Sequence, residues 1–267
     1  ARKGSPLVIG VGIGEMFAAS DASALLPVTQ QFVYLDEGDC AEITCKGYEV
    51  FDAQNQPLTR QAHQTTLTDE AVDKGPYRHF MLKEVYEQPR ALTNTLEGRT
   101  ANNHVLEAIL GPQAAALLEK VQRVHIVACG TSSYAGMVAR YWMEQIARIP
   151  CRAELASEFR YRDPIIEEGT LFVTISQSGE TADTLAALRH AKQYSLAGSL
   201  VVCNVPQSSL VRESDIALMT HAGPEIGVAS TKAFTTQLMA LALVTLLLAR
   251  RRGLSAQDEA HYVTALK

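Results

Sequence analysis

The stretch that decides the fold is LFVTISQSGET, residues 171–181. A short apolar run rich in β-branched residues ends in small hydroxyl residues and a glycine, and apolar residues at helical spacing follow. This order predicts a buried parallel strand, a tight turn and the start of a helix. The unpaired N–H groups of a helix start favour an anion, and Ser176, Ser178 and Thr181 add hydroxyl donors. A Ser/Thr helix cap without a ligand has the same pattern, so this turn alone leaves both interpretations open.

A second turn of the same kind lies earlier in the chain. The strand-like run VHIVAC, residues 124–129, leads into the hydroxyl-rich run GTSS, residues 130–133. In an open α/β sheet ligands bind outside the carboxyl ends of the strands, so two such turns can converge on one anion. Together they favour a phosphorylated small molecule over helix capping alone.

Strands and helices alternate from about residue 96 onward. Further strands are expected at 151–154, 199–204 and 216–219, and a long final helix is expected to begin near residue 230. This alternation predicts an α/β fold, a doubly wound parallel sheet with flanking helices.

Composition excludes several classes of protein. The chain has 47% hydrophobic and 20% charged residues and a net charge of −5, which is typical of a soluble protein without a nucleic-acid footprint. Its five cysteines have neither zinc-site nor disulfide-scaffold spacing, so we expect no metal and a cytoplasmic location. The apolar run 238–249 is shorter than the roughly 18–20 residues of a membrane span, and predicts a buried helix.

The first 68 residues have a different character. Strands are expected at 6–11 and 32–35, a hairpin at 40–52, and a brief helix at 18–26. The run GVGIG, residues 10–14, is close to a dinucleotide fingerprint, but its third glycine comes one place early and no clear helix follows. We therefore expect no NAD and no other cofactor.

Several segments resemble one family. CGTS (129–132) and SQSGET (176–181) resemble the phosphate-binding turns of sugar isomerase (SIS) domains. Four more segments resemble the isomerase half and the linker of the glutamine–fructose-6-phosphate amidotransferase family: YRHFMLKEVYEQP (77–89), ASEFRYR (156–162), NVPQSSLVRESD (204–215) and EIGVASTKAFTTQ (225–237). The resemblance runs nearly end to end. It implies the C-terminal part of an N-terminal-nucleophile glutaminase sandwich (1–68), a polar interdomain linker (69–95) and a first SIS domain (96–267).

The resemblance also implies a binding site for fructose 6-phosphate and glucosamine 6-phosphate. Its residues come from the first turn, the second turn and the loop before the last helix: Cys129, Gly130, Thr131, Ser132, Ser176, Gln177, Ser178, Thr181, Val228 and Ser230. Cys129 is expected to be a pocket wall, since nothing beside it indicates a base. The Glu180 carboxylate would repel a phosphate, so we expect it to face away from the site.

The resemblance implies no catalytic residue in this chain. The family's glutaminase nucleophile is an N-terminal cysteine, whereas residue 1 is Ala1. Its isomerase acid–base groups belong to a second SIS copy, so we expect an internal segment of a homodimeric enzyme. The alternative is a non-catalytic SIS-type sugar-phosphate sensor, which would not account for residues 1–68. A regulator that binds nucleic acid would need a basic helix-turn-helix, and none is visible.

Overall fold

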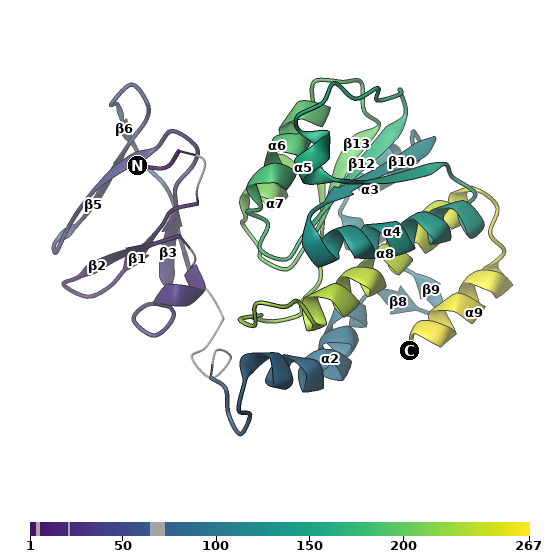
Figure 1. Cartoon of the computed structure of the whole chain (residues 1–267), viewed down its shortest axis with the longest axis horizontal. Coiled ribbons are helices and arrows are strands. Elements are labelled where there is room, and N and C mark those ends of the chain that lie inside the picture. The colour runs from purple at the N-terminus through teal and green to yellow at the C-terminus, as the bar shows by residue number, and fades with distance from the viewer. Residues whose placement is uncertain (4–5, 21, 65–72) are drawn as a thin grey trace. The chain divides into compact units, whose positions relative to one another are not determined.

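The computed structural model describes residues 1–3, 6–20, 22–64 and 73–267 (Figure 1). These residues form two compact units, Ala1–Gly75 and Pro76–Lys267. The division expected at residue 68 lies outside the described residues. Each unit has its own hydrophobic clusters.

The first unit consists of antiparallel sheets. Strands β2, β1, β3 and β7 form one sheet in that order, and β4, β5 and β6 form the other. Their bounds are β1 Val8–Val11, β2 Met16–Ala19, β3 Gln31–Tyr34, β4 Cys40–Thr44, β5 Gly47–Phe51, β6 Pro57–Leu58 and β7 Ala62–Gln64.

Alternate residues of β1 serve two small cores. Val8 packs with Phe32 and the short 3₁₀ helix η1 (Ala22–Leu25), whereas Ile9 packs with Val33 and with Val50 of the other sheet. The two sheets therefore share apolar contacts, as a sandwich requires.

Two sequence expectations for this unit can be compared with the structure. The helix expected at 18–26 is only partly right, because residues 16–19 pair with β1 as strand β2. The glycine-rich run 10–14 lies at the end of β1 and in the turn that leads to β2. Gly10 and Val11 belong to an antiparallel hairpin, so this run does not open a dinucleotide-binding βα unit.

The second unit is built on five parallel strands, in the order β11-β10-β12-β13-β14. All five strands fall at or close to the positions expected from the sequence. Their bounds are β10 Arg123–Ala128, β11 Cys151–Leu155, β12 Thr170–Ser176, β13 Gly198–Cys203 and β14 Ile216–Met219.

Helices cover both faces of this sheet (Figure 1). One face packs against α4 (Gly130–Gln145) and α8 (Lys232–Arg251), and the other against α5 (Ala156–Phe159), α6 (Ala182–Ala191) and α7 (Ser209–Glu213). Successive residues of β10, β12 and β13 alternate between the two cores, so these central strands are almost completely buried, as parallel strands covered on both faces are. The smaller elements are α2 (Phe80–Leu96), β8 (Thr100–Ala101), β9 (His104–Val105), η2 (Glu107–Leu110), α3 (Ala114–Leu118) and α9 (Ala256–Leu266).

Helix α2 contains a proline in its interior, Pro89, within the segment expected to be an interdomain linker. Proline cannot donate to the carbonyl four residues earlier, here that of Val85. The Gln88 side chain donates to the Val85 carbonyl instead, at 3.1 Å from Nε2. The helix therefore continues through Pro89 and packs against α8.

Helix α8 is the one described helix that is long and apolar enough to cross a membrane. Inside this structure, 78% of its most apolar window is buried. It packs against α4 and α2 and contributes much of the core on its face of the sheet. The structure therefore uses α8 as a core helix, as the sequence predicted.

Candidate functional site

The order of the parallel strands defines a switch point. From β10 the chain passes to β11 on one side and then crosses to β12 on the other side. Ligands of open α/β sheets bind at such a point, outside the carboxyl ends of the strands. Both hydroxyl-rich turns lie here, one after β10 and the other after β12.

The first turn joins β10 directly to α4. Cys129 precedes the helix in extended conformation and is half-buried, and Thr131 is exposed in the first helical turn. The Ser133 hydroxyl donates to the Gly130 carbonyl at 2.6 Å, so this serine stabilises the turn itself. Of the predicted residues, Gly130 is exposed and Ser132 half-buried.

The second turn is ordered by its own hydroxyl groups. Ser176 is buried, accepts a hydrogen bond from the Gly179 N–H at 3.0 Å, and lies 3.0 Å from the Thr181 hydroxyl. Ser178 accepts from the Glu180 N–H at 3.2 Å. Thr181 occupies the N-cap position of α6 without a side-chain capping bond, and the first N–H groups of the helix have no partner within it. The turn therefore offers backbone donors at a helix start.

The two turns are in contact. The Thr184 hydroxyl in the first turn of α6 lies 3.9 Å from the Cys129 sulfur. Their parent strands are neighbours, with Ala128 opposite Ile175. The structure thus places the predicted residues of both turns at one edge of the sheet.

The third predicted segment precedes α8. The Val228 side chain is fully exposed, and the Ser230 hydroxyl donates to Glu225 at 3.0 Å. Lys232, which could have reached an anion, is 3% exposed and forms an ion pair with Glu87 at 2.5 Å. It is therefore used within the fold.

Asn204 links the second turn to the chain that leads into this segment. Its N–H donates to the Gln177 carbonyl at 3.3 Å, and its side-chain Nδ2 donates to the Gly223 carbonyl at 2.7 Å. Its side-chain oxygen accepts from the Ala222 N–H at 2.7 Å. Asn204 was not among the predicted site residues. The sequence signal that could have identified Asn204 is its position, as a polar residue directly after strand β13.

Glu180 stabilises the start of a neighbouring helix. One of its carboxylate oxygens accepts the N–H of Ser209, the first residue of α7, at 2.7 Å. This contact directs the carboxylate to α7, as the expected orientation away from the phosphate turn requires. Below the turn, burial raises the pKa of the Cys203 thiol, so Cys203 is a neutral packing group.

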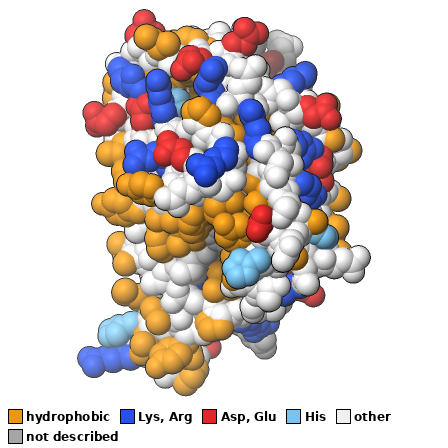
Figure 2. All heavy atoms as spheres, turned by 90° about the vertical axis from the view of Figure 1, so that its right-hand side faces the viewer, with side chains coloured by type: hydrophobic (Ala, Val, Ile, Leu, Met, Phe, Trp, Pro, Cys, Tyr) orange, Lys and Arg blue, Asp and Glu red, His pale blue; other side chains and the backbone are white. Residues whose placement is uncertain are grey.

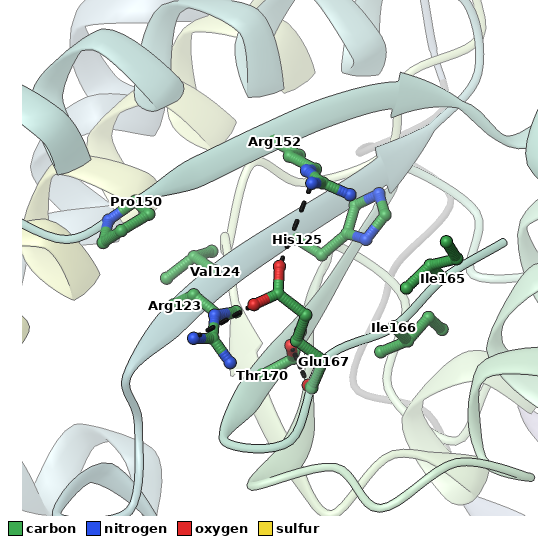
Figure 3. A pocket seen from close by; sticks show the side chains of 9 residues that line it. All are labelled: Arg123, Val124, His125, Pro150, Arg152, Ile165, Ile166, Glu167 and Thr170. Atoms are coloured by element: carbon green, nitrogen blue, oxygen red, sulfur yellow. Dashed lines mark hydrogen bonds and ion pairs between the residues drawn. The ribbon is translucent and has the colours of Figure 1, made fainter.

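A separate cavity of about 100 Å³ lies at the other end of the strands, opposite the two turns (Figure 3). In this cavity the Glu167 carboxylate lies 3.2 Å from the guanidinium of Arg123 and 3.9 Å from that of Arg152. His125 lines the same cavity and lies 2.9 Å from Glu154, and burial lowers its pKa although Glu154 opposes that shift. This cavity is at the amino-terminal ends of β10 and β12, so it is distinct from the candidate site. Within the described part of the chain, no three His, Cys, Asp or Glu side chains form a group that could hold a metal ion.

Comparisons with known proteins identify relatives of this chain. A family model described as the SIS domain matches residues 117–247. The chain is 60% identical over 268 residues to the isomerizing glutamine–fructose-6-phosphate aminotransferase of Pseudomonas putida, and 56% identical over 267 residues to that of Escherichia coli. Each match covers 100% of this chain and 44% of the relative, so the chain spans less than half of their length.

A solved structure is similar as well. It is described as the C-terminal domain of glucosamine-fructose-6-phosphate aminotransferase from Francisella tularensis, with 55% identity and a TM-score of 0.71. The match covers 73% of this chain and 55% of that one. The predicted SIS-type parallel fold and the predicted family resemblance are confirmed. The chain carries a SIS domain and is related, over its full length, to part of the isomerizing glutamine–fructose-6-phosphate aminotransferases.

Proposed function

We propose that this chain binds a sugar phosphate through its two hydroxyl-rich turns. As part of a longer enzyme, it would serve the conversion of fructose 6-phosphate and glutamine to glucosamine 6-phosphate and glutamate. The observation that carries the proposal is the position of both turns at the switch point between β10 and β12. The name of these relatives, glutamine–fructose-6-phosphate aminotransferase, supports the choice of substrate.

The phosphate would lie against the second turn. The N–H groups at the start of α6 and the positive end of its dipole favour an anion. Ser176, Gln177, Ser178 and Thr181 would supply hydroxyl and amide donors around it. Binding of this kind depends on oriented dipoles, since Lys232 is already paired with Glu87.

The sugar would extend from the phosphate toward the first turn and the loop before α8. Cys129, Gly130, Thr131 and Ser132 would line one side, and Val228 and Ser230 the other. We assign binding and no proton transfer to these residues, because hydroxyl groups do not titrate near neutral pH. Cys129 would be a wall of the pocket.

The domain division and the location of the chain also belong to this proposal. We infer that residues 1–68 are the C-terminal part of a glutaminase region, that 69–95 connect it to the SIS region, and that 96–267 form a first SIS domain. We also infer a cytoplasmic location, which the five free thiols favour.

We also infer a homodimer. Apolar side chains are exposed on α2 and α4. Figure 2 shows one face of the molecule, where hydrophobic side chains gather below a region rich in charged ones. Those on the two helices are Met81, Leu82, Val85, Tyr86, Tyr134, Met137 and Tyr141. A surface of this kind is typical of contact with another protein surface. Sedimentation at several protein concentrations tests it, and a strictly monomeric chain would refute it.

Calorimetric titration with glucosamine 6-phosphate or fructose 6-phosphate tests the binding proposal. The Ser176→Ala/Ser178→Ala variant should bind at least about tenfold more weakly, which corresponds to roughly 1.4 kcal/mol. The matched control is Ser255→Ala, which removes a hydroxyl that caps α9, away from the proposed site. A well-folded chain that binds neither sugar phosphate would contradict the proposal and favour simple helix capping.

A further inference from the structure

The loop at residues 224–231, called the site loop below, lacks an apolar anchor of its own at its centre. It is the last part of the connection between β14 and α8, and it carries Val228 and Ser230. Ile226 is 42% exposed and Val228 is fully exposed. Polar contacts with neighbouring elements must therefore fix the path of this loop.

A buried carboxylate on α2 makes the central contact. Oε1 of Glu84 accepts the N–H of Ile226 at 2.6 Å and that of Gly227 at 2.9 Å. Glu84 is 2% exposed, and a Cβ atom on Gly227 would lie 2.5 Å from its other oxygen, Oε2. The two hydrogen bonds hold two consecutive peptide groups of the site loop in one orientation. Glu84 can approach them this closely because residue 227 is a glycine.

Two further carboxylates fix the end of the site loop. Glu225 accepts from the Ser230 hydroxyl at 3.0 Å, and from the N–H groups of Thr231 and Ala233 at 2.9 and 3.0 Å. Glu87, one turn after Glu84 on α2, forms an ion pair with Lys232. Helix α2 lies beside α8 (Figure 1), so it holds the site loop at its centre and at its end.

We propose that Glu84 is a positioning residue for the sugar-phosphate site. Its two hydrogen bonds fix the backbone immediately before Val228, and so set where Val228 and Ser230 meet the sugar. Hydrogen bonds from N–H groups to a carboxylate are stronger than neutral ones, and both are shielded from water here. This inference rests on the proposed function, because it assigns Val228 and Ser230 to that site.

Two ligands separate the role of Glu84 from that of the phosphate turns. Inorganic phosphate would contact only the turns, whereas glucosamine 6-phosphate would also contact the site loop. In the full 267-residue chain, Glu84→Ala should weaken glucosamine 6-phosphate about tenfold, the effect of losing one to two net hydrogen bonds. It should leave the phosphate affinity unchanged, as followed by the amide NMR shifts of residues 177–181. Ser176→Ala/Ser178→Ala should weaken both ligands.

Control variants exclude a general loss of structure. Glu84→Gln keeps an acceptor oxygen and should recover most of the affinity. Gly227→Ala perturbs the same contact from the side of the site loop and should reproduce the defect of Glu84→Ala. This second variant tests the contact even if Glu84→Ala folds poorly. Glu119→Ala removes an exposed carboxylate of the same unit and should change nothing.

The outcomes distinguish this inference from the proposed function. If Glu84→Ala binds glucosamine 6-phosphate like the wild type, or weakens both ligands equally, Glu84 has no positioning role. If the wild type binds neither ligand, the proposed function fails. In that case amide hydrogen exchange tests Glu84 separately. Faster exchange in Glu84→Ala that is confined to residues 224–231 would support the inference that Glu84 fixes the site loop. Unchanged exchange rates would overturn that inference.

Discussion

Gly179 and Ser208 approach so closely that a Cβ atom on Gly179 would lie 1.9 Å from the Ser208 hydroxyl oxygen. Ser208 is buried and precedes α7, and the Leu210 N–H donates to the Gly179 carbonyl at 3.0 Å. Gly179 also has a φ of +69°, a backbone angle that residues other than glycine rarely adopt. The second turn therefore requires glycine for two independent reasons.

Replacing Gly179 by alanine should be much more costly than an ordinary glycine substitution. The left-handed backbone costs about 1–2 kcal/mol for alanine. Overlap with Ser208 should add about 1–3 kcal/mol, as overpacking of a core does. Urea unfolding, followed by fluorescence of the single tryptophan Trp142, measures the loss in the second unit.

Gly98 provides the matched control. It has the same φ of +69°, but a Cβ atom there would meet nothing within 4 Å. Gly98→Ala should therefore show only the backbone cost. Equal losses for Gly98→Ala and Gly179→Ala would mean that contact with Ser208 contributes nothing.

The five thiols should react with iodoacetamide at different rates. Cys40 and Cys45 are exposed and should react first, whereas Cys151 and Cys203 are buried. Burial raises the pKa of Cys151 to about 12 and also raises that of Cys203, so neither supplies thiolate in the folded chain. Peptide mass spectrometry after timed labelling gives each rate.

Ligand should protect only Cys129. This half-buried thiol lies between the two turns, so glucosamine 6-phosphate should slow its labelling several-fold and leave that of Cys40 and Cys45 unchanged. Labelling of Cys129 that saturating ligand does not alter would place it outside the pocket.

Glu259 should make stability depend on acid pH. Burial alone would raise the pKa of this carboxyl, but hydrogen bonds from Arg250, the Val105 N–H and His104 outweigh burial and lower it below the ordinary 4.5. A lowered folded-state pKa stabilises the protein above the unfolded-state pKa, and this stability is lost as pH falls through the folded-state value. The wild type should therefore lose stability below about pH 4.5 more steeply than Glu259→Gln does.

Thermal melts between pH 3 and 7 test this difference. At pH 7, Glu259→Gln should be less stable by about 1–3 kcal/mol, because a charge-assisted hydrogen bond to Arg250 is lost. Parallel pH profiles for the two proteins would show that Glu259 is not a source of the acid sensitivity.

The parallel sheet was predictable because its strands carry the strongest signal in the sequence. Runs such as residues 171–176 are largely apolar without strict alternation and end in turn residues, so strand type and position follow together. The two turns were predictable for the same reason, since each directly follows such a run. Neighbouring parallel strands then bring the turns to one edge without further information.

The orientation of α4 was harder to infer. Its larger apolar residues fall on one face, yet Tyr134 and Tyr141 are exposed while Ala135 and Ala139 are fully buried against the sheet. Small residues let the helix approach the sheet closely, and a hydrophobic pattern cannot tell that contact from one with another protein. Strand β2 was missed because pairing with β1 outweighs the helix preference of its alanines.

The role of α2 also depends on contacts distant in sequence. Glu84 lies in a polar, proline-marked segment, where acidic residues are usually exposed. Its burial follows from partners at residues 226 and 227, more than 140 positions later in the chain. The sequence of residues 77–89 alone therefore gives no way to predict that Glu84 is buried.

The ion pair between Lys232 and Glu87 should respond unequally to loss of either partner. The Lys232 side chain is 4% exposed and that of Glu87 is 31% exposed. Glu87→Gln leaves a buried ammonium group without its carboxylate, and should cost about 3 kcal/mol. Lys232→Met keeps a side chain of similar volume and leaves Glu87 near water and 3.6 Å from Lys83, so it should cost about 1 kcal/mol or less.

Urea unfolding of both single variants and of Glu87→Gln/Lys232→Met, followed by Trp142 fluorescence, completes a double-mutant cycle. The double variant should be more stable than Glu87→Gln alone, because it removes the unpaired buried charge. A larger loss for Lys232→Met than for Glu87→Gln would mean that the aliphatic packing of Lys232 outweighs its charge. Strict additivity would mean that the two groups are energetically independent despite their 2.5 Å separation.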